Sequence, residues 1–255
     1  RGLRCPYNSN MSTPRFYCPV PLVAGSVLAL PESAARHAVR ALRLGAGDAL
    51  ILFDGAGGEY RSRIAEVTRS AVSVEVGDHL ERSCESPLHV TLIQALQTGD
   101  KMDLTVQKAV ELGVAEIVPV LSRRSVLRLS GERAERRVEH WRGVVASACE
   151  QCGRNRLPTV AQIVHLERWL AQPSSPDVLR LILDPEGGYA LRDSARPPGG
   201  RVEVLIGAEG GLAPEELEWA GAAGFRGVRL GPRVLRTETA GLAVLAVLQN
   251  LWGDF

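Results

Sequence analysis

Hydrophobic and polar positions alternate in short runs along the first third of the chain, a pattern that predicts β-strands. Three such runs occur: Asp48–Asp54, Glu59–Glu66 and Ala71–Val76. A helix is predicted over Pro31–Leu44, because proline stands at its front and Gly45 follows its end. These elements predict a compact β-barrel-like domain over residues 11–82.

From residue 88 onward strands alternate with amphipathic helices, which predicts an α/β domain with a parallel sheet over residues 88–255. The expected strands are His89–Ala95, Glu116–Leu121, Leu179–Asp184, Val202–Ile206 and Gly227–Leu230. The expected helices are one that begins near Asp100, then Gly131–Glu150, Pro214–Ala223 and Thr237–Trp252. Several of the strands are almost continuously apolar, which is typical of strands covered on both faces.

The remaining segments are expected to lie outside both domains. Residues 83–87 are polar and end in proline, so they form the predicted linker. Residues 1–10 precede Met11, a plausible true start, and are interpreted as a leader outside the fold.

Composition narrows the class of protein. The chain has 255 residues, 45% hydrophobic and 23% charged, which excludes disordered and collagen-like structure. Its longest apolar run, Ala240–Leu248, is far shorter than the ~18 residues of a membrane span, and no secretion signal is visible. Five cysteines, an odd number, fit a reducing compartment, so a cytoplasmic protein is expected. Five scattered histidines predict no metal site.

The net charge of +1 conceals an uneven distribution of arginine. Only Lys101 and Lys108 are lysines, and residues 123–156 hold nine arginines against four glutamates. Residues 225–236 hold four arginines and no acid. Arginine binds phosphate well, so these stretches are candidate nucleic-acid contacts. The alternative is that they are solvated faces of a chain that uses arginine generally.

The glycine-rich segment 206–212, Ile-Gly-Ala-Glu-Gly-Gly-Leu, lies between a predicted strand and helix, where α/β sheets bind ligands. Its spacing matches neither the G-x-x-x-x-G-K-[ST] phosphate-binding loop nor the G-x-G-x-x-G dinucleotide-binding loop. The following helix opens with Glu215 and Glu216, which would repel a phosphate. A neutral or cationic cofactor therefore suits the segment better, and a purely structural turn is the alternative.

Residues 230–240, Leu-Gly-Pro-Arg-Val-Leu-Arg-Thr-Glu-Thr-Ala, form the second candidate. Thr237 or Thr239 can cap the final helix. Arg236 would then stand at the start of a buried helix, where a cation is poorly placed without an anionic partner or substrate. A functional role and an ion pair with Glu238 or Glu209 are both open. Taken together, these features favour an enzyme that acts on RNA over a simple binding module.

The two segments together resemble the C-terminal signature of the RsmE family, the ribosomal RNA uracil-N3 methyltransferases of the SPOUT class. The resemblance covers nearly the whole chain from Pro14. It includes residues 14–17, 37–43, 47–48, 53–55, 101–103, 107–113 and 150–154. The order and spacing of these segments make the resemblance specific. Ala208 departs from it, because the family usually has proline there.

The resemblance implies a PUA-like β-barrel domain followed by a parallel-sheet SPOUT methyltransferase domain with a C-terminal trefoil knot. It also implies a cytoplasmic homodimer that binds S-adenosyl-L-methionine and contains no metal. The residues implied to hold the cofactor are Leu183, Ile206, Gly207, Glu209, Gly210, Gly211, Leu230, Gly231, Val234, Leu235 and Thr239.

The implied reaction is methylation of a uridine N3 in 16S rRNA, within the small ribosomal subunit. Arg236 is the candidate that stabilises the uracil anion, with Thr237 or Glu238 orienting it or relaying the proton, and the base is either Glu238 or a water molecule. The implied RNA-binding residues are Arg15, Arg36, Arg40, Arg43, Arg123, Arg124 and Arg154. Two other functions are open: a non-catalytic RNA-binding or ribosome-assembly factor, and a SPOUT methyltransferase acting on tRNA.

Overall fold

The computed structural model describes residues 13–173, 175–189, 191–193 and 195–255. The predicted leader, residues 1–10, lies outside the described residues. The chain forms two compact units, each described by itself. The first unit runs to Cys84 and also includes Gly153–Arg156. The second comprises Glu85–Cys152 and Leu157–Phe255.

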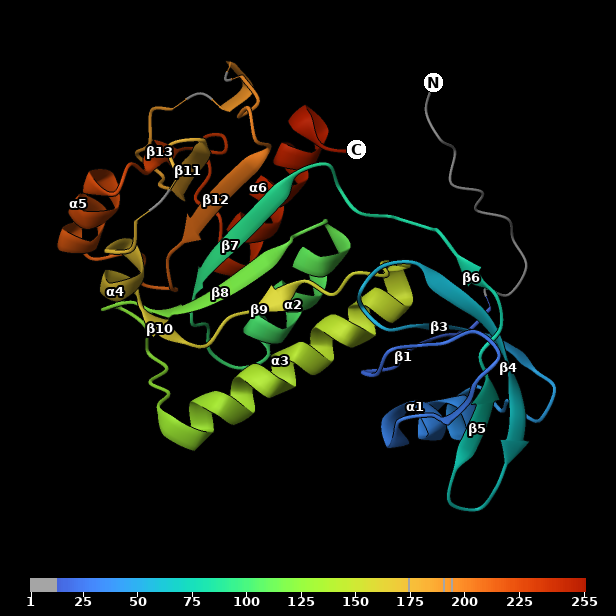
Figure 1. The fold of residues 1–255 in the computed structure, drawn as a ribbon. Helices are drawn as coiled ribbons and strands as arrows, with labels where there is room; N and C mark the ends of the chain where they lie inside the picture. Colours follow the sequence, from blue (N-terminus) through green and yellow to red (C-terminus); the bar gives the residue numbers. More distant parts are fainter. Residues whose placement is uncertain (1–12, 174, 190, 194) are drawn as a thin grey trace. The chain divides into compact units, whose positions relative to one another are not determined.

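The first unit is built on one mostly antiparallel sheet (Figure 1). Its strands are β1 (Arg15–Tyr17), β2 (Val27–Ala29), β3 (Ala49–Phe53), β4 (Glu59–Val67), β5 (Val72–Glu75) and β6 (His79–Leu80). The order is β1-β3-β4-β5-β2, with β6 also paired to β4; only the β1–β3 pair is parallel. The alternating pattern predicted β3, β4 and β5. The other three strands are too short to leave a period of two.

The predicted helix Pro31–Leu44 is two shorter pieces. Helix α1 (Glu32–Arg36) continues into a π-helical turn, η1 (His37–Ala41). Ala34 and Ala38 are buried in the hydrophobic core of the first unit, and Leu44, which follows the π-helical turn, packs against the same core. The chain leaves the turn through Arg43 in the left-handed region, at φ 58°. Tertiary packing therefore overrides the regular 3.6-residue period.

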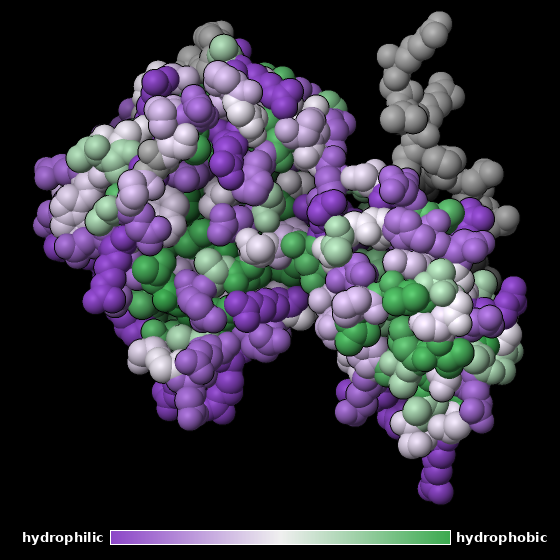
Figure 2. All heavy atoms as spheres, in the orientation of Figure 1, coloured by the Kyte–Doolittle hydropathy of each residue, from purple (hydrophilic) through white to green (hydrophobic). Residues whose placement is uncertain are grey.

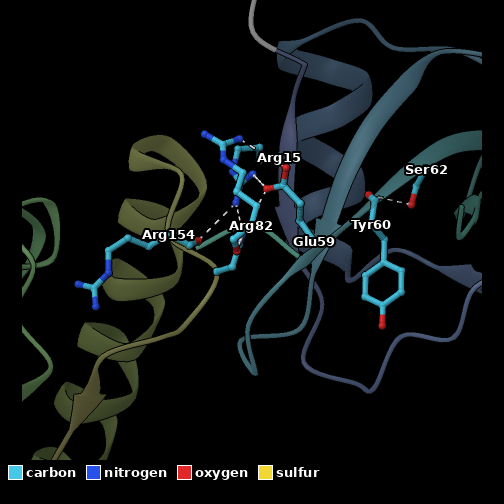
Figure 3. Close-up of polar contacts among 7 residues, drawn as sticks. Arg15, Glu59, Tyr60, Ser62, Arg82 and Arg154 are labelled. Atoms are coloured by element: carbon cyan, nitrogen blue, oxygen red, sulfur yellow. Dashed lines mark hydrogen bonds and ion pairs between the residues drawn. The ribbon is translucent and has the colours of Figure 1, made fainter. Parts of the chain in front are cut away.

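A buried ionic network holds the segment Gly153–Arg156 in the first unit (Figure 3). The carboxylate of Glu59, 2% exposed, pairs with Arg15 and, at 3.4 Å, with Arg82. The amide of Asn155 donates to the same carboxylate at 3.3 Å and to the Arg82 carbonyl at 3.1 Å. Arg15 also donates to the Arg154 carbonyl at 3.4 Å. The expected continuous second domain is thus interrupted, because these four residues pack with the first unit.

The second unit contains a parallel sheet. Its strands are β7 (His89–Ala95), β8 (Glu116–Leu121), β9 (Thr159–Val160), β10 (Val164–His165), β11 (Val178–Leu183), β12 (Arg201–Ile206) and β13 (Arg226–Val228). The order is β10-β8-β7-β12-β11-β13, with β9 also paired to β8. The parallel α/β architecture predicted from the alternation of elements is confirmed.

Helices cover both faces of this sheet (Figure 1). They are α2 (Lys101–Glu111), α3 (Gly131–Cys152), α4 (Leu166–Leu170), α5 (Pro214–Ala222) and α6 (Thr237–Trp252), with a short 3₁₀ turn, η2 (Leu191–Asp193). Helix α6 packs on β7 and β12 and against α2, which in turn packs on α3. Helices α4 and α5 pack together on the opposite face, over Ile93, Val118 and Leu205.

The sheet order determines where a site can form. Strands β7, β12 and β11 are neighbours, so the loops that follow their carboxyl ends converge at one edge of the sheet. These loops begin at Leu96, Gly207 and Asp184, and the N-terminus of α6 joins them. No described helix is long and apolar enough to cross a membrane. In Figure 2 the amino-terminal half of α3 is covered by hydrophilic side chains.

Candidate active site

A pocket of about 580 Å³ opens at the carboxyl ends of β11 and β12. Its walls come from the loop after β11, the glycine-rich loop after β12, and the segment that leads into α6. The lining residues are Lys101, Leu183–Pro185, Ile206–Glu209, Gly211, Leu212, Leu217, Val234–Glu238 and Ala240. A volume of this size is ordinary for a small-molecule or cofactor site.

The glycine-rich loop is a tight turn that requires its glycines. Gly211 has φ 71°, and its N–H donates to the Ala208 carbonyl at 2.8 Å. A Cβ on Gly207 would lie 3.0 Å from the Gly211 carbonyl carbon. Backbone atoms therefore form this wall of the pocket, which favours recognition of a ligand through main-chain groups.

The two carboxylates that follow the glycine-rich loop, Glu215 and Glu216, bind other groups of the same chain. Glu216, 2% exposed, accepts from the Ala213 N–H at 2.8 Å and from the Arg123 N–H at 2.7 Å. Glu215 pairs with the Arg123 side chain at 3.5 Å. The N-terminus of α5 is thus satisfied internally, which agrees with the expectation that it does not bind phosphate.

Glu209 anchors the glycine-rich loop to the start of α2. Its Oε1 accepts from the backbone N–H of Thr98 at 3.1 Å, from the Thr98 hydroxyl at 2.9 Å and from the Lys101 ammonium at 3.3 Å. Burial by itself raises the pKa of this carboxyl, but the hydrogen bonds outweigh burial and the net pKa lies below the ordinary value. Glu209 is therefore ionised at neutral pH and places negative charge beside the pocket.

Arg236 lines the pocket at the N-cap of α6. Its side chain is exposed and makes no ion pair with any described residue, although Glu238 is two positions away. Glu209, the other possible partner, is bound by Thr98 and Lys101. The ion-pair alternative for Arg236 is therefore wrong within the described chain. The cation remains available to a ligand.

Thr237 does not cap α6, contrary to expectation, because Arg236 occupies the N-cap position and Thr237 the first helical one. Its buried hydroxyl donates to the Gly207 carbonyl at 2.6 Å and accepts from the Gln94 amide at 3.1 Å. Thr237 thus ties the glycine-rich loop to α6. The other candidate cap, Thr239, makes no side-chain cap either.

Glu238 lines the same pocket and has one buried oxygen, Oε2, without a hydrogen-bond partner among the described residues. An unpartnered buried carboxylate oxygen is costly unless it has a function or a ligand. The carboxylate of Glu238 therefore keeps one oxygen that no described residue uses.

Most of the expected cofactor residues meet in this pocket. Those that line it are Leu183, Ile206, Gly207, Glu209, Gly211, Val234 and Leu235. Leu230 and Gly231 line a neighbouring cavity along α6 instead. Gly210 and Thr239 line neither, although the Gly210 carbonyl accepts from Arg124 at 3.0 Å.

The expected RNA-binding arginines separate into two groups. Arg36, Arg40 and Arg43 are exposed on the first unit, and Arg123 and Arg124 lie beside the glycine-rich loop of the second. Arg15 departs from the expectation, because it is held by Glu59 and Asn155 and stacks on Phe53. Arg154 is only 6% exposed.

The arginines of α3 support the solvated-face alternative. Arg136 pairs with Glu132 at 2.9 Å, and Arg142 pairs with Glu139 at 3.3 Å, on neighbouring turns of the same helix. Local pairs of this kind are typical of a solvated helix face, although they use two of the four glutamates already counted and so leave the surplus of arginine in this stretch unchanged.

Sequence reasoning missed several residues of the site. Lys101 lines the pocket, and Gln94, Gln97 and Thr98 support its walls. Lys101 is one of only two lysines, a signal that could have singled it out. The glutamines belong to an apolar strand and its following loop, and nothing in their spacing indicates a contact with α6. Within the residues described, no cluster of His, Cys, Asp or Glu is arranged to hold a metal.

Family models match both units. The model for the RNA methyltransferase domain matches residues 84–249, and that for the RNA methyltransferase PUA domain matches residues 30–77. The fold, the pocket and these matches define the chain as an RNA methyltransferase with a PUA-like domain.

Individual relatives narrow the family. The ribosomal RNA small subunit methyltransferase E of Mycobacterium tuberculosis is 31% identical, over 93% of this chain and 92% of its own length. The crystal structure of the Neisseria gonorrhoeae protein of that name, bound to S-adenosyl methionine, is 42% identical with a TM-score of 0.90, over 95% and 99% of the two chains. A Legionella pneumophila methyltransferase structure with bound SAM is 37% identical with a TM-score of 0.91, over 96% and 100%. The chain belongs to the ribosomal RNA small subunit methyltransferase E family, and the resemblance to RsmE is confirmed.

Proposed function

We propose that this protein is an S-adenosylmethionine-dependent enzyme that methylates N3 of a uridine in 16S rRNA. The observation that carries the proposal is the pocket, where Arg236 and Glu238 meet the glycine-rich loop in a member of the methyltransferase E family. The proposed substrate is the rRNA of the small ribosomal subunit, which the names of the relatives specify, and the proposed location is the cytoplasm.

The residues present fit S-adenosylmethionine. Apolar side chains of Leu183, Ile206 and Leu235 offer a surface for the adenine ring, and the backbone of Gly207–Gly211 offers hydrogen bonds. Three carboxylates, from Asp184, Glu209 and Glu238, surround the cavity and favour a sulfonium cation. When bound, the cofactor supplies an activated methyl group.

The chain's own residues then handle the charge and the proton of uridine. N3 carries a proton and becomes a good nucleophile only when that proton leaves. Glu238 accepts it through the oxygen that has no other partner. The Arg236 guanidinium, which has five donors and no ion-pair partner in the described chain, stabilises the negative charge on the uracil oxygens. Thr237 acts by fixing the segment between them.

RNA is held by the exposed arginines on both units. Arg36 on α1, Arg40 on η1 and Arg43 just after η1 form an exposed cluster on the PUA-like unit, and Arg123 and Arg124 lie beside the glycine-rich loop and α5. We assign Arg15 and Arg154 structural roles instead, because both are largely buried.

Three further features are proposed with this function. The first unit closes as a barrel, and the segment 229–236, which lines a small cavity together with the loop after β11, belongs to a trefoil knot. The protein is a homodimer, whose interface includes the cavity of about 740 Å³ along α6, lined by Leu230, Leu235 and Val247 among others. The units correspond to an RNA-binding and a methyltransferase domain.

The test is transfer of labelled methyl from S-adenosylmethionine to small ribosomal subunits that lack N3-methyluridine, with nucleoside analysis of the product. We expect N3-methyluridine from the wild type and a loss of at least ~100-fold in Arg236→Ala. Arg136→Ala, on the solvated face of α3, is the matched control and should retain activity.

The alternatives give different results. Cofactor binding without transfer to the small subunit, but with transfer to tRNA, would identify a tRNA methyltransferase. RNA binding without cofactor binding in calorimetry would identify a non-catalytic assembly factor. Either result contradicts the proposed reaction.

A further inference from the structure

Helix α6 carries an arginine where a helix ordinarily has its cap. The first N–H groups of a helix need outside acceptors, which a Ser, Thr, Asp or Asn at the N-cap usually supplies. At this N-cap stands Arg236, which has no acceptor, and no side-chain cap bond forms from it. Because an arginine side chain occupies the N-cap, the acceptor for the first N–H groups of α6 must come from another part of the chain.

The acceptor is Gln97, in the loop after β7. We assign the orientation of its carboxamide from its neighbours, because in the opposite orientation the oxygen faces only acceptors and the nitrogen only donors. In the assigned orientation the side-chain oxygen accepts from the Glu238 N–H at 3.1 Å, and the amide nitrogen donates to the Thr105 hydroxyl at 2.9 Å and the Lys101 carbonyl at 3.3 Å. This orientation of the carboxamide satisfies both of its ends. Gln97 and Thr105 are fully buried. The cap of α6 is therefore fastened to α2.

Gln94 supplies a second support. Its amide donates to the Thr237 hydroxyl at 3.1 Å and to the Ala95 carbonyl at 3.1 Å, while Thr237 donates to Gly207. Two buried glutamines thus hold residues 236–238 against the glycine-rich loop and α2. Gln97 is bonded at both ends of its carboxamide, and a buried group of this kind is rigid because moving either end leaves an unsatisfied group. Gln94 is held through its amide nitrogen, since its Oε1 has no hydrogen-bond partner among the described residues.

We propose that Gln97 is a positioning residue for methyl transfer. It acts as the cap of α6 in place of residue 236, and so holds Glu238 and Arg236 at the pocket. The inference rests on the proposed function, and it adds a residue that touches neither substrate nor cofactor. It predicts that loss of the Gln97 carboxamide lowers kcat while cofactor affinity stays nearly unchanged.

The principal variant is Gln97→Met, which keeps the side chain's approximate volume and removes its hydrogen bonds. We expect a fall in kcat of about 30- to 100-fold, because small misplacements of reacting groups cost up to ~100-fold. The dissociation constant for S-adenosylmethionine, measured by calorimetry, should change less than about threefold, since the pocket walls contributed by Leu183 and Gly207 remain.

Gln249→Met is the matched control. Gln249 is equally buried, near the other end of α6, where it donates to the Leu112 carbonyl at 3.0 Å and accepts from the Ser86 hydroxyl at 2.6 Å. The Gln249→Met substitution likewise removes a buried carboxamide that is bonded at both ends and supports α6, but at a position away from the pocket. We expect a lower melting temperature and an unchanged kcat for the folded protein.

A second variant, Gln97→Glu, separates positioning from folding. A protonated carboxyl can both accept from the Glu238 N–H and donate to the Lys101 carbonyl, whereas a carboxylate has no donor for that carbonyl. The ratio of its kcat to that of the wild type should therefore rise as the pH is lowered. A merely structural role predicts a ratio that does not depend on pH once both proteins are folded.

The outcomes are distinct. Inactive wild type on every RNA tested means that the proposed function has failed. Active wild type with an unchanged kcat in Gln97→Met, or with losses in Gln97→Met and Gln249→Met that follow the folded fraction equally, overturns the role of Gln97. A selective loss of kcat in Gln97→Met, with a pH-dependent ratio in Gln97→Glu, supports it.

Discussion

Arg236→Ser should make the protein more stable and far less active. Serine is a strongly preferred N-cap, worth about 1 kcal/mol over a non-capping residue. The gain here should be smaller, because Gln97 already accepts from the Glu238 N–H and the Thr239 N–H donates to the Arg236 carbonyl at 2.9 Å. Removal of a cation from the positive end of the helix adds a few tenths of a kcal/mol at this exposed position.

The expected net gain is about 0.5–1 kcal/mol, which corresponds to about 1–4 °C in Tm for a domain of this size. Differential scanning calorimetry measures the shift, and methyl transfer to small subunits measures the activity, which should fall at least ~100-fold. Arg233→Ser is the control for stability, since it removes the same charge from the preceding loop and not from the N-cap.

Two results would contradict these two expectations separately. A Tm of Arg236→Ser at or below the wild type would refute the capping argument. Retention of more than about a tenth of the activity would refute the assignment of Arg236 as the group that stabilises the uracil anion.

Two further predictions concern the first unit. Burial raises the pKa of Glu59, but Arg15, Arg82 and Asn155 together lower it more, so its net pKa lies below the ordinary value for a glutamate. The free energy of unfolding of the wild type should therefore fall as the pH drops from about 5 through that lowered pKa. Glu59→Gln should be less stable at neutral pH, and its free energy of unfolding, measured by urea titration, should depend less on acid pH. Parallel pH curves for the two proteins would contradict this expectation. Neutralising the exposed arginine cluster should weaken RNA binding and reduce the slope of log K against log salt by about 2, whereas an unchanged slope would exclude the cluster from the RNA contact. The cluster variant combines Arg36→Gln, Arg40→Gln and Arg43→Gln.

Local pattern alone determined much of this fold. Near-continuous apolar runs and intervening amphipathic helices predicted the parallel sheet, because burial on both faces demands such strands whatever their neighbours. The glycine-rich loop was a candidate because it lies between a strand and a helix, where α/β sheets bind ligands. The segment around Arg236 was a candidate because a cation is unfavourable at the start of a helix. The family resemblance joined the two segments into one site.

Only the tertiary structure decided which of these residues are free to act. Arg15 and Arg236 were both candidate functional residues, yet Arg15 is ion-paired with Glu59 whereas Arg236 has no ion-pair partner among the described residues. The roles of Gln97 and of Gly153–Arg156 were likewise invisible, since each depends on partners far away in the sequence. Periodicity records which face of an element is buried, whereas the pairing of buried polar groups depends on how elements meet in space.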